Sequence, residues 1–205
     1  MKVKICGITN VDDALSAADL GADALGFIFV TSSPRYITPS AARKIIQALP
    51  PFVVPVGVVA DMTYHEILEV INQTRIGCVQ LHGEEMPERL IQYPTPVYKS
   101  FRVDSGFDPE ILRRYKGSAY LLDTKISGEL GGTGQTFDWE IAVKAKKYGR
   151  IILAGGLTPG NIIEAARIVQ PYAVDVNSGV EERPGKKDHA KLKMLFERLK
   201  QMNNV

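Results

Sequence analysis

The sequence has little cysteine: two residues, Cys6 and Cys78, in a chain of 205. They lie far apart in strand-like runs and lack the short spacing of a metal site, so neither a disulfide scaffold nor bound metal is expected. Excess charge is also scarce, since 25 lysines and arginines face 23 aspartates and glutamates. A formal net charge of +2 gives no basic field, and no nucleic-acid partner is expected.

Long apolar runs are absent as well. The longest apolar-rich stretch, 50–60, contains three prolines and is too short to span a bilayer, so no membrane partner is expected. The opening segment, Met1–Cys6, has too few apolar residues to form the core of an export signal. We therefore expect a cytoplasmic protein whose thiols are reduced.

What the sequence does contain is a regular alternation of strand and helix patterns. The expected strands cover residues 2–6, 24–29, 53–59, 78–81, 97–101, 120–123, 151–154 and 173–176. The expected helices cover residues 11–20, 39–48, 64–73, 87–92, 109–115, 139–148, 160–169 and 188–201. Eight units of about 26 residues fill the chain, which predicts an α/β fold, a single compact (β/α)8 TIM barrel over residues 1–205. The alternative is an open doubly wound sheet, but residues 6–9, CGIT, are not the GxGxxG turn typical of that fold.

Two of the connections that follow strands are long. One, 30–37, contains Arg35, and the other, 124–137, contains four glycines. In a parallel barrel all such connections lie at the carboxyl ends of the strands, where active sites are built. Glycine allows many backbone conformations, so the second connection could close over a substrate, or it could be an ordinary surface loop.

The last two expected strands end in sequences suited to phosphate. The seventh strand leads into Gly155 and Gly156, and the eighth leads into Asn177, Ser178 and Gly179. In barrels of this kind the loops after strands seven and eight frequently bind phosphate through free backbone N–H groups, and glycine lets the main chain come close. The sequence therefore predicts a phosphate site here, with two ordinary tight turns as the alternative.

Several titratable residues also lie at strand ends. Cys6 ends the first expected strand, Asp123 ends the sixth, Asp175 lies in the eighth, and His82 follows the fourth. Alternation places Lys4 on the same face as Cys6, about 6.6 Å away along the strand. Taken alone, Cys6 could be a small buried apolar residue, Asp123 a polar cap and His82 a structural hydrogen-bonding residue. Cys78 is expected in the core.

A run of short segments, taken together and in order, resembles the phosphoribosylanthranilate isomerase family. The matching segments cover essentially the whole chain: KICGIT at 4–9, GADALGFIF at 21–29, SPRYI at 33–37, VQLHGEE at 79–85, LLD at 121–123, GGTG at 131–134, FDW at 137–139, AGGL at 154–157, DVNSGVE at 175–181 and PGKKD at 184–188. Each segment is a weak signal alone, whereas the ordered set is highly specific.

The resemblance implies the third step of tryptophan biosynthesis, an Amadori rearrangement of N-(5-phosphoribosyl)anthranilate to 1-(2-carboxyphenylamino)-1-deoxyribulose 5-phosphate. It implies Cys6 as general base, Asp123 as general acid and no cofactor or metal. Both groups then need shifted pKa values, with some thiolate at neutral pH and a partly protonated aspartate. Arg35 would bind the anthranilate carboxylate, because its planar fork suits bidentate pairing. Asp175 and His82 would either contact the substrate directly or support the residues that contact it.

Two other readings compete with this one. Another phosphosugar isomerase or epimerase barrel is expected to carry a carboxylate base at the end of the first strand, or metal ligands at strand ends. A catalytically silent phosphate-binding barrel would not need both Cys6 and Asp123.

The oligomeric state stays open between monomer and homodimer. The corner Pro50–Phe52 precedes the third strand, on the face away from the expected site. It could anchor a dimer at low ordering cost, or it could plug the bottom of the barrel.

Overall fold

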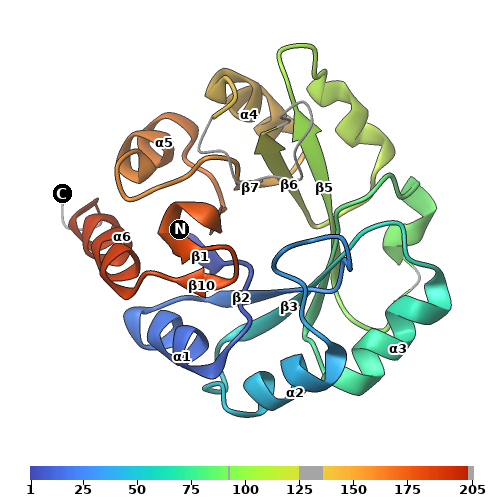
Figure 1. Ribbon diagram of the computed structural model, residues 1–205. Coiled ribbons are helices and arrows are strands. Elements are labelled where there is room, and N and C mark those ends of the chain that lie inside the picture. Colours follow the sequence, from blue (N-terminus) through green and yellow to red (C-terminus); the bar gives the residue numbers. More distant parts are fainter. Residues whose placement is uncertain (92, 125–135, 203–205) are drawn as a thin grey trace.

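Eight parallel strands form a closed barrel in chain order in the computed structural model, which describes residues 1–91, 93–124 and 136–202 (Figure 1). The strands are β1 (Lys2–Ile5), β2 (Ala24–Ile28), β3 (Val54–Val59), β4 (Cys78–Leu81), β5 (Val97–Val103), β6 (Ala119–Thr124), β7 (Arg150–Leu153) and β8 (Ala173–Val176). Since β8 also pairs with β1, no edge of the sheet is left open. The predicted barrel is therefore confirmed.

Helices surround the barrel, but two of those expected are not α-helical. The α-helices are α1 (Val11–Leu20), α2 (Pro39–Gln47), α3 (Tyr64–Thr74), α4 (Trp139–Ala145), α5 (Ile162–Val169) and α6 (His189–Met202). The helices expected after β4 and β5 are instead the 3₁₀ helices η1 (Pro87–Ile91) and η2 (Pro109–Arg114), and another, η3 (Lys146–Tyr148), follows α4. Segments of five or six residues form too few i→i−4 hydrogen bonds to offset the cost of starting an α-helix.

Capping residues hold the ends of the helices. The side chains of Asn10 and Thr38 accept hydrogen bonds from the first turns of α1 and α2. Thr63 and Glu66 form a reciprocal capping box at the start of α3. Gly21 ends α1 with φ of 113°, in the left-handed region that favours glycine.

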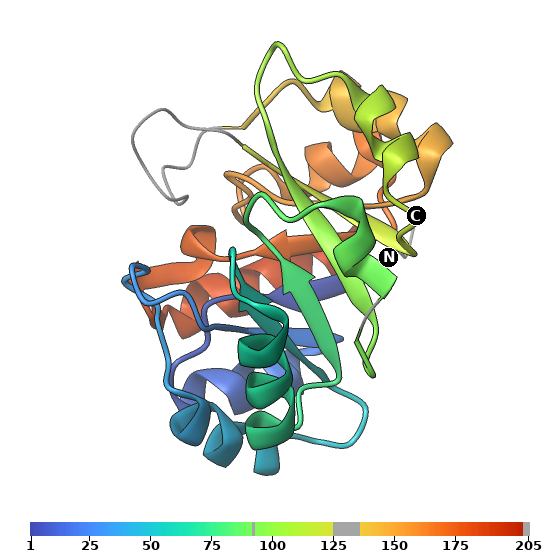
Figure 2. The ribbon, with the colours of Figure 1, turned by 90° about the vertical axis from the view of Figure 1, so that its right-hand side faces the viewer.

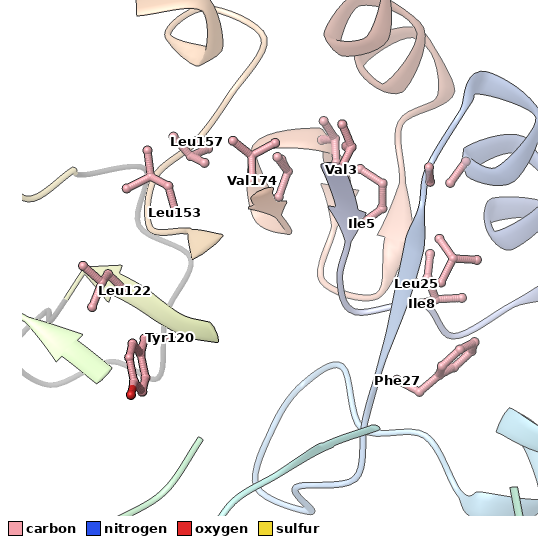
Figure 3. Close-up of a cluster of buried hydrophobic side chains, with 14 of the residues drawn as sticks. Val3, Ile5, Ile8, Leu25, Phe27, Tyr120, Leu122, Leu153, Leu157 and Val174 are labelled. Atoms are coloured by element: carbon pink, nitrogen blue, oxygen red, sulfur yellow. The ribbon is translucent and has the colours of Figure 1, made fainter. Parts of the chain in front are cut away.

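Alternation along the strands divides the barrel side chains into two sets. One set faces the helices and joins the main apolar core, part of which Figure 3 shows with side chains from β1, β2, β6, β7 and β8. The other set forms an inner cluster of Val56, Tyr98, Ala119, Leu121, Ile152, Ala154 and Ala173, against which Cys78 packs as predicted. The inner set turns polar toward the carboxyl ends of the strands, and this change of polarity positions the site.

An unpredicted hairpin follows the barrel. The 3₁₀ helix η4 (Ser178–Val180) leads into the short antiparallel strands β9 (Glu181–Arg183) and β10 (Lys186–Lys187). The buried carboxylate of Asp13 in α1 holds the hairpin, since it accepts hydrogen bonds from the Lys187 backbone N–H and from Lys186. The hairpin brings Glu181 and Lys187 to the mouth of the barrel.

The connections that follow the strands lie at one end of the barrel, and the N-terminus lies at the other. In Figure 2 the connections after the strands lie on the left, and the N-terminus lies on the right. The glycine-rich connection expected at 124–137 falls largely on residues 125–135, outside the described residues. Within the described part of the chain, no helix is long and apolar enough to cross a membrane.

Candidate active site

A pocket opens at the carboxyl ends of the strands and gathers most of the predicted site residues. Its lining includes Cys6, Arg35, His82, Asp123, Gly155, Gly156, Asp175, Asn177 and Ser178. Gly179 lies outside the lining and packs tightly against the backbone of Leu157, where a Cβ would come within 1.9 Å of the carbonyl oxygen. Residues from six different strands or their connections thus meet in one place, as the barrel topology predicts.

Asp123 lies near the end of β6 and faces the pocket. Burial, reinforced by the nearby negative charge of Asp175, raises the pKa of Asp123 to about 6. Roughly a tenth of this carboxyl group is therefore protonated at pH 7, far more than for an ordinary aspartate, which suits a general acid.

Cys6 lies just beyond β1, and its thiol is buried against β2. A Cβ at position 26 would lie 2.6 Å from the Cys6 sulfur, so the thiol position requires Gly26. Burial raises the pKa of the Cys6 thiol, although Lys4 and Lys187 oppose the rise. The unliganded site therefore favours the thiol over the thiolate that was expected at neutral pH, because desolvation outweighs the two cations.

Lys4 on β1 carries a buried positive charge inside the barrel. Its ammonium group lies 2.5 Å from Asp175 Oδ2 and 2.7 Å from Gln80 Oε1. Burial opposes the charge, but Asp175, Cys6 and Tyr98 together outweigh it and raise the pKa of Lys4 well above its ordinary value. The other carboxylate oxygen of Asp175, Oδ1, is buried and has no hydrogen-bond partner among the described residues, so it can accept one from a ligand.

His82 follows β4 and lies between two of these groups. Its Nδ1 is 3.0 Å from the amide nitrogen of Gln80, and its Nε2 is 3.7 Å from Asp123 Oδ2. Burial lowers the pKa of His82 to about 3, and the positive charges of Lys4, Arg102 and Lys99 add to this effect. The imidazole is therefore neutral throughout the physiological range.

Arg35 is buried and fixed by an ion pair. Its Nε lies 3.0 Å and its Nη2 2.7 Å from the carboxylate of Glu181, which Lys187 also contacts at 3.0 Å. This fork occupies the Nε–Nη2 edge of the guanidinium group and leaves the Nη1–Nη2 edge available. Since Arg35 lines the pocket, a ligand carboxylate can pair with that second edge.

The candidate phosphate site consists mainly of backbone. Gly155 and Gly156 have φ of 81° and 64°, and a Cβ on Gly155 would lie 2.2 Å from Thr124 Oγ1. The Asn177 side-chain oxygen is held by Lys187 at 3.0 Å. Within the described residues no acceptor is found for the N–H groups of Gly155, Gly156 and Ser178, which can therefore bind an anion.

Five further residues belong to this site that the sequence analysis did not predict. They are Gln80, Tyr98, Arg102, Glu181 and Lys187. The period-two alternation that relates Lys4 to Cys6 also relates Gln80 to His82 and Tyr98 to Arg102, so three of them carried a usable signal. The other two, Glu181 and Lys187, lie on the hairpin, which no periodic pattern in the sequence predicted. No cluster of three metal-ligating side chains occurs among the residues that the structure describes.

Comparison with known proteins identifies the family. The family model described as "PRAI: N-(5'phosphoribosyl)anthranilate (PRA) isomerase" matches residues 3–198. A curated N-(5'-phosphoribosyl)anthranilate isomerase of Geobacter sp. strain M21 is 50% identical over 206 residues, covering 98% of this chain and 99% of the relative. The chain belongs to the N-(5'-phosphoribosyl)anthranilate isomerase family. It is thus an isomerase of tryptophan biosynthesis, as the resemblance implied.

Solved structures of phosphoribosylanthranilate isomerases agree with the fold. The Thermus thermophilus enzyme superposes with a TM-score of 0.91 at 44% identity, covering 98% of this chain and 100% of that one. One structure in complex with reduced 1-(o-carboxyphenylamino)-1-deoxyribulose 5-phosphate has a TM-score of 0.88 and 42% identity, with 98% and 99% covered. Another shows monomers generated from the dimeric Thermotoga maritima enzyme, at a TM-score of 0.86, 40% identity and 98% of each chain covered.

Proposed function

We propose that this isomerase converts N-(5-phosphoribosyl)anthranilate by general acid–base catalysis, with Asp123 as acid and Cys6 as base. The observation that carries the proposal is their meeting in one buried pocket, where burial raises the pKa of Asp123 to about 6. The complex of a 42% identical relative with a reduced product analogue supports the substrate class. We extend the proposal to one catalytic domain over residues 1–205, located in the cytoplasm.

The reaction needs two proton transfers. Asp123 gives its proton to the furanose ring oxygen, the C1–O bond breaks, and the arylamine nitrogen pair forms an iminium ion. Cys6 then removes the C2 proton, and the C2–H electrons form an enolamine, which tautomerises to the ketose. Neither step changes the oxidation state of the molecule as a whole, so no external oxidant or reductant enters.

The two pKa values define the reactive ionisation state. The Cys6 pKa lies above that of Asp123, so a thiol and a carboxylate are the major form between them. The productive form, a thiolate with a carboxylic acid, has the same total charge and is a constant minor fraction across that range. The iminium ion adds positive charge beside Cys6, which favours the thiolate when the base is needed.

The remaining residues bind the substrate. The unpartnered Oδ1 of Asp175 accepts a hydrogen bond from the arylamine N–H or a sugar hydroxyl. The backbone N–H groups of Gly155, Gly156 and Ser178, with Asn177 and Gly179 shaping the turn, bind the phosphate. His82 lies beside Asp123, with its Nε2 3.7 Å from Asp123 Oδ2.

The direct test is turnover of phosphoribosylanthranilate, followed as loss of substrate fluorescence with the purified protein. We expect complete conversion without added metal and in the presence of a chelator. Unaltered substrate after prolonged incubation would contradict the proposal and favour a silent phosphate-binding barrel.

Arg35 gives a prediction about binding. Replacing Arg35 with alanine should raise KM about 10- to 100-fold with a small change in kcat, because charge-assisted hydrogen bonds to the anthranilate carboxylate are lost. Steady-state kinetics measures this, and the Arg35→Lys variant, which keeps the charge without the fork, should recover part of the loss. An unchanged KM would show that the carboxylate binds elsewhere.

We further propose that the chain forms a homodimer through the end of the barrel opposite the pocket. Phe52 is 93% exposed there, which is incompatible with a plug of the barrel bottom. Met1, Val54 and Tyr172 are further exposed apolar residues, at or just before the starts of β1, β3 and β8. The dimeric origin of the Thermotoga maritima monomers described above supports this proposal.

Phe52 should therefore control the mass in solution. The Phe52→Glu variant places a charge in the contact, so we expect sedimentation at the mass of one chain where the wild type sediments at twice that mass. Met194→Glu, at another exposed apolar residue on α6, is the matched control and should stay dimeric. A Phe52→Glu variant with the wild-type mass would exclude Phe52 as the anchor.

A further inference from the structure

Gln80 is a buried amide inside the barrel, where its side chain contacts Lys4, Tyr98 and His82. It belongs to β4 and is 2% exposed. Its Oε1 is 2.7 Å from the Lys4 ammonium group and 2.8 Å from the Tyr98 hydroxyl, and its Nε2 is 3.0 Å from His82 Nδ1. The amide thus connects the buried cation on β1 with the imidazole beside Asp123.

The orientation of this amide follows from the chemistry of lysine. An ammonium group has three hydrogens to donate and no acceptor, so it must face the oxygen of the Gln80 side chain. Lys4 keeps its charge because Asp175, 2.5 Å away, raises its pKa well above the ordinary value despite burial. The NH₂ group of Gln80 is therefore turned toward His82.

The proton of His82 is then placed as well. An amide NH₂ group only donates, so Nδ1 of His82 must accept, and the hydrogen of the neutral ring must be on Nε2. The charged groups around the ring are Lys4 on β1, Lys99 and Arg102 on β5 and Asp123 on β6. Three cations against one carboxylate disfavour an imidazolium ion, which agrees with a neutral ring.

We propose that Gln80 is a positioning residue of the isomerase reaction, which holds the proton of His82 on Nε2 so that the ring presents a hydrogen-bond donor to Asp123. This inference rests on the proposed role of Asp123 as the acid. Once Asp123 has given its proton to the substrate, the new carboxylate accepts from His82 Nε2–H, and the present 3.7 Å separation shortens. The same tautomer has no lone pair facing Asp123, so the acid proton passes to the substrate and not to His82.

Nitrogen-15 NMR of the imidazole rings tests the first half of the inference in the wild-type protein without substrate. The chain has three histidines, and the His82→Gln variant assigns the His82 signals by their loss. We expect an unprotonated Nδ1 and a protonated Nε2 for His82, without titration between pH 5 and pH 8. A proton on Nδ1, or a titration near the ordinary histidine pKa of about 6.5, would overturn the inference.

The Gln80→Glu variant tests the second half. A carboxylate at this position can still accept from Lys4 and Tyr98, but it can only accept from His82, so Nδ1 should become protonated. We expect kcat to fall about 10- to 100-fold with KM changed less than about threefold, since the altered donor acts on the acid and not on binding. The matched control is Gln73→Glu, the same substitution at an exposed position of α3, which should leave both the His82 tautomer and kcat unchanged.

The outcomes separate this inference from the proposed function. An unprotonated Nδ1 in Gln80→Glu, or a protonated Nδ1 with kcat unchanged, contradicts the role of Gln80 and leaves Cys6 and Asp123 in place. Wild-type turnover by Asp123→Asn contradicts the proposed function itself, whichever nitrogen of His82 carries the proton.

Discussion

Replacing Cys6 with serine should lower kcat about 10²- to 10⁴-fold, the range that a positioned general base contributes. A serine hydroxyl nearly matches the thiol in size, and its far higher pKa leaves almost no alkoxide to remove the C2 proton. The change can be measured as the initial rate of fluorescence loss at saturating substrate. Thermal unfolding followed by circular dichroism should show that the fold is retained.

The second cysteine supplies a matched control. Cys78 packs against the inner apolar cluster, and burial raises the pKa of its thiol to about 11, so it is inert at neutral pH. Cys78→Ser should keep kcat within about threefold of the wild-type value. If Cys6→Ser and Cys78→Ser turned over equally well, Cys6 would not be the base.

The barrel was readable from the sequence because each of its units carries local signals. Asn10 and Thr38 mark helix starts, Gly21 marks a helix end, and apolar strand runs recur at a regular period. The chain order of the strands then follows, since right-handed connections between neighbours leave a closed barrel as the natural solution for eight units. The errors lie where segments are short, as in η1 and η2.

The site was only partly readable, since its chemistry depends on pairs that are distant in sequence. Strand ends and resemblance pointed to Cys6 and Asp123, but the network joining Lys4, Gln80 and Asp175 spans 171 residues and exists only in the closed barrel. The direction of the Cys6 pKa also required the structure, because desolvation by neighbouring strands outweighs cations that the sequence places nearby. Glu181 reaches Arg35 through a hairpin of two or three residues per strand, too short to leave a periodic signal.

Asp123→Asn should combine a large loss of activity with a gain in stability. An amide cannot protonate the ring oxygen, so kcat should fall about 10²- to 10⁴-fold. The free enzyme should also lose the acidic limb near pH 6 in its profile of kcat/KM, because the wild-type Asp123 titrates there. The surface variant Asp19→Asn, on α1, is the matched control and should keep both the rate and the limb.

The stability effect has a definite sign. The Asp123 pKa is raised in the folded state, so the folded protein binds more protons than the unfolded chain between about pH 4 and pH 6, and stability falls as pH rises through that window. Asparagine removes the buried charge, so Asp123→Asn should unfold at a higher temperature than the wild type at pH 8 and show little difference at pH 4. The gain in unfolding free energy should not exceed about 3 kcal/mol, the equivalent of the pKa change. Equal melting temperatures at pH 8 would mean that solvent reaches the carboxylate, and the acid would then lack the desolvation that holds its proton near neutral pH.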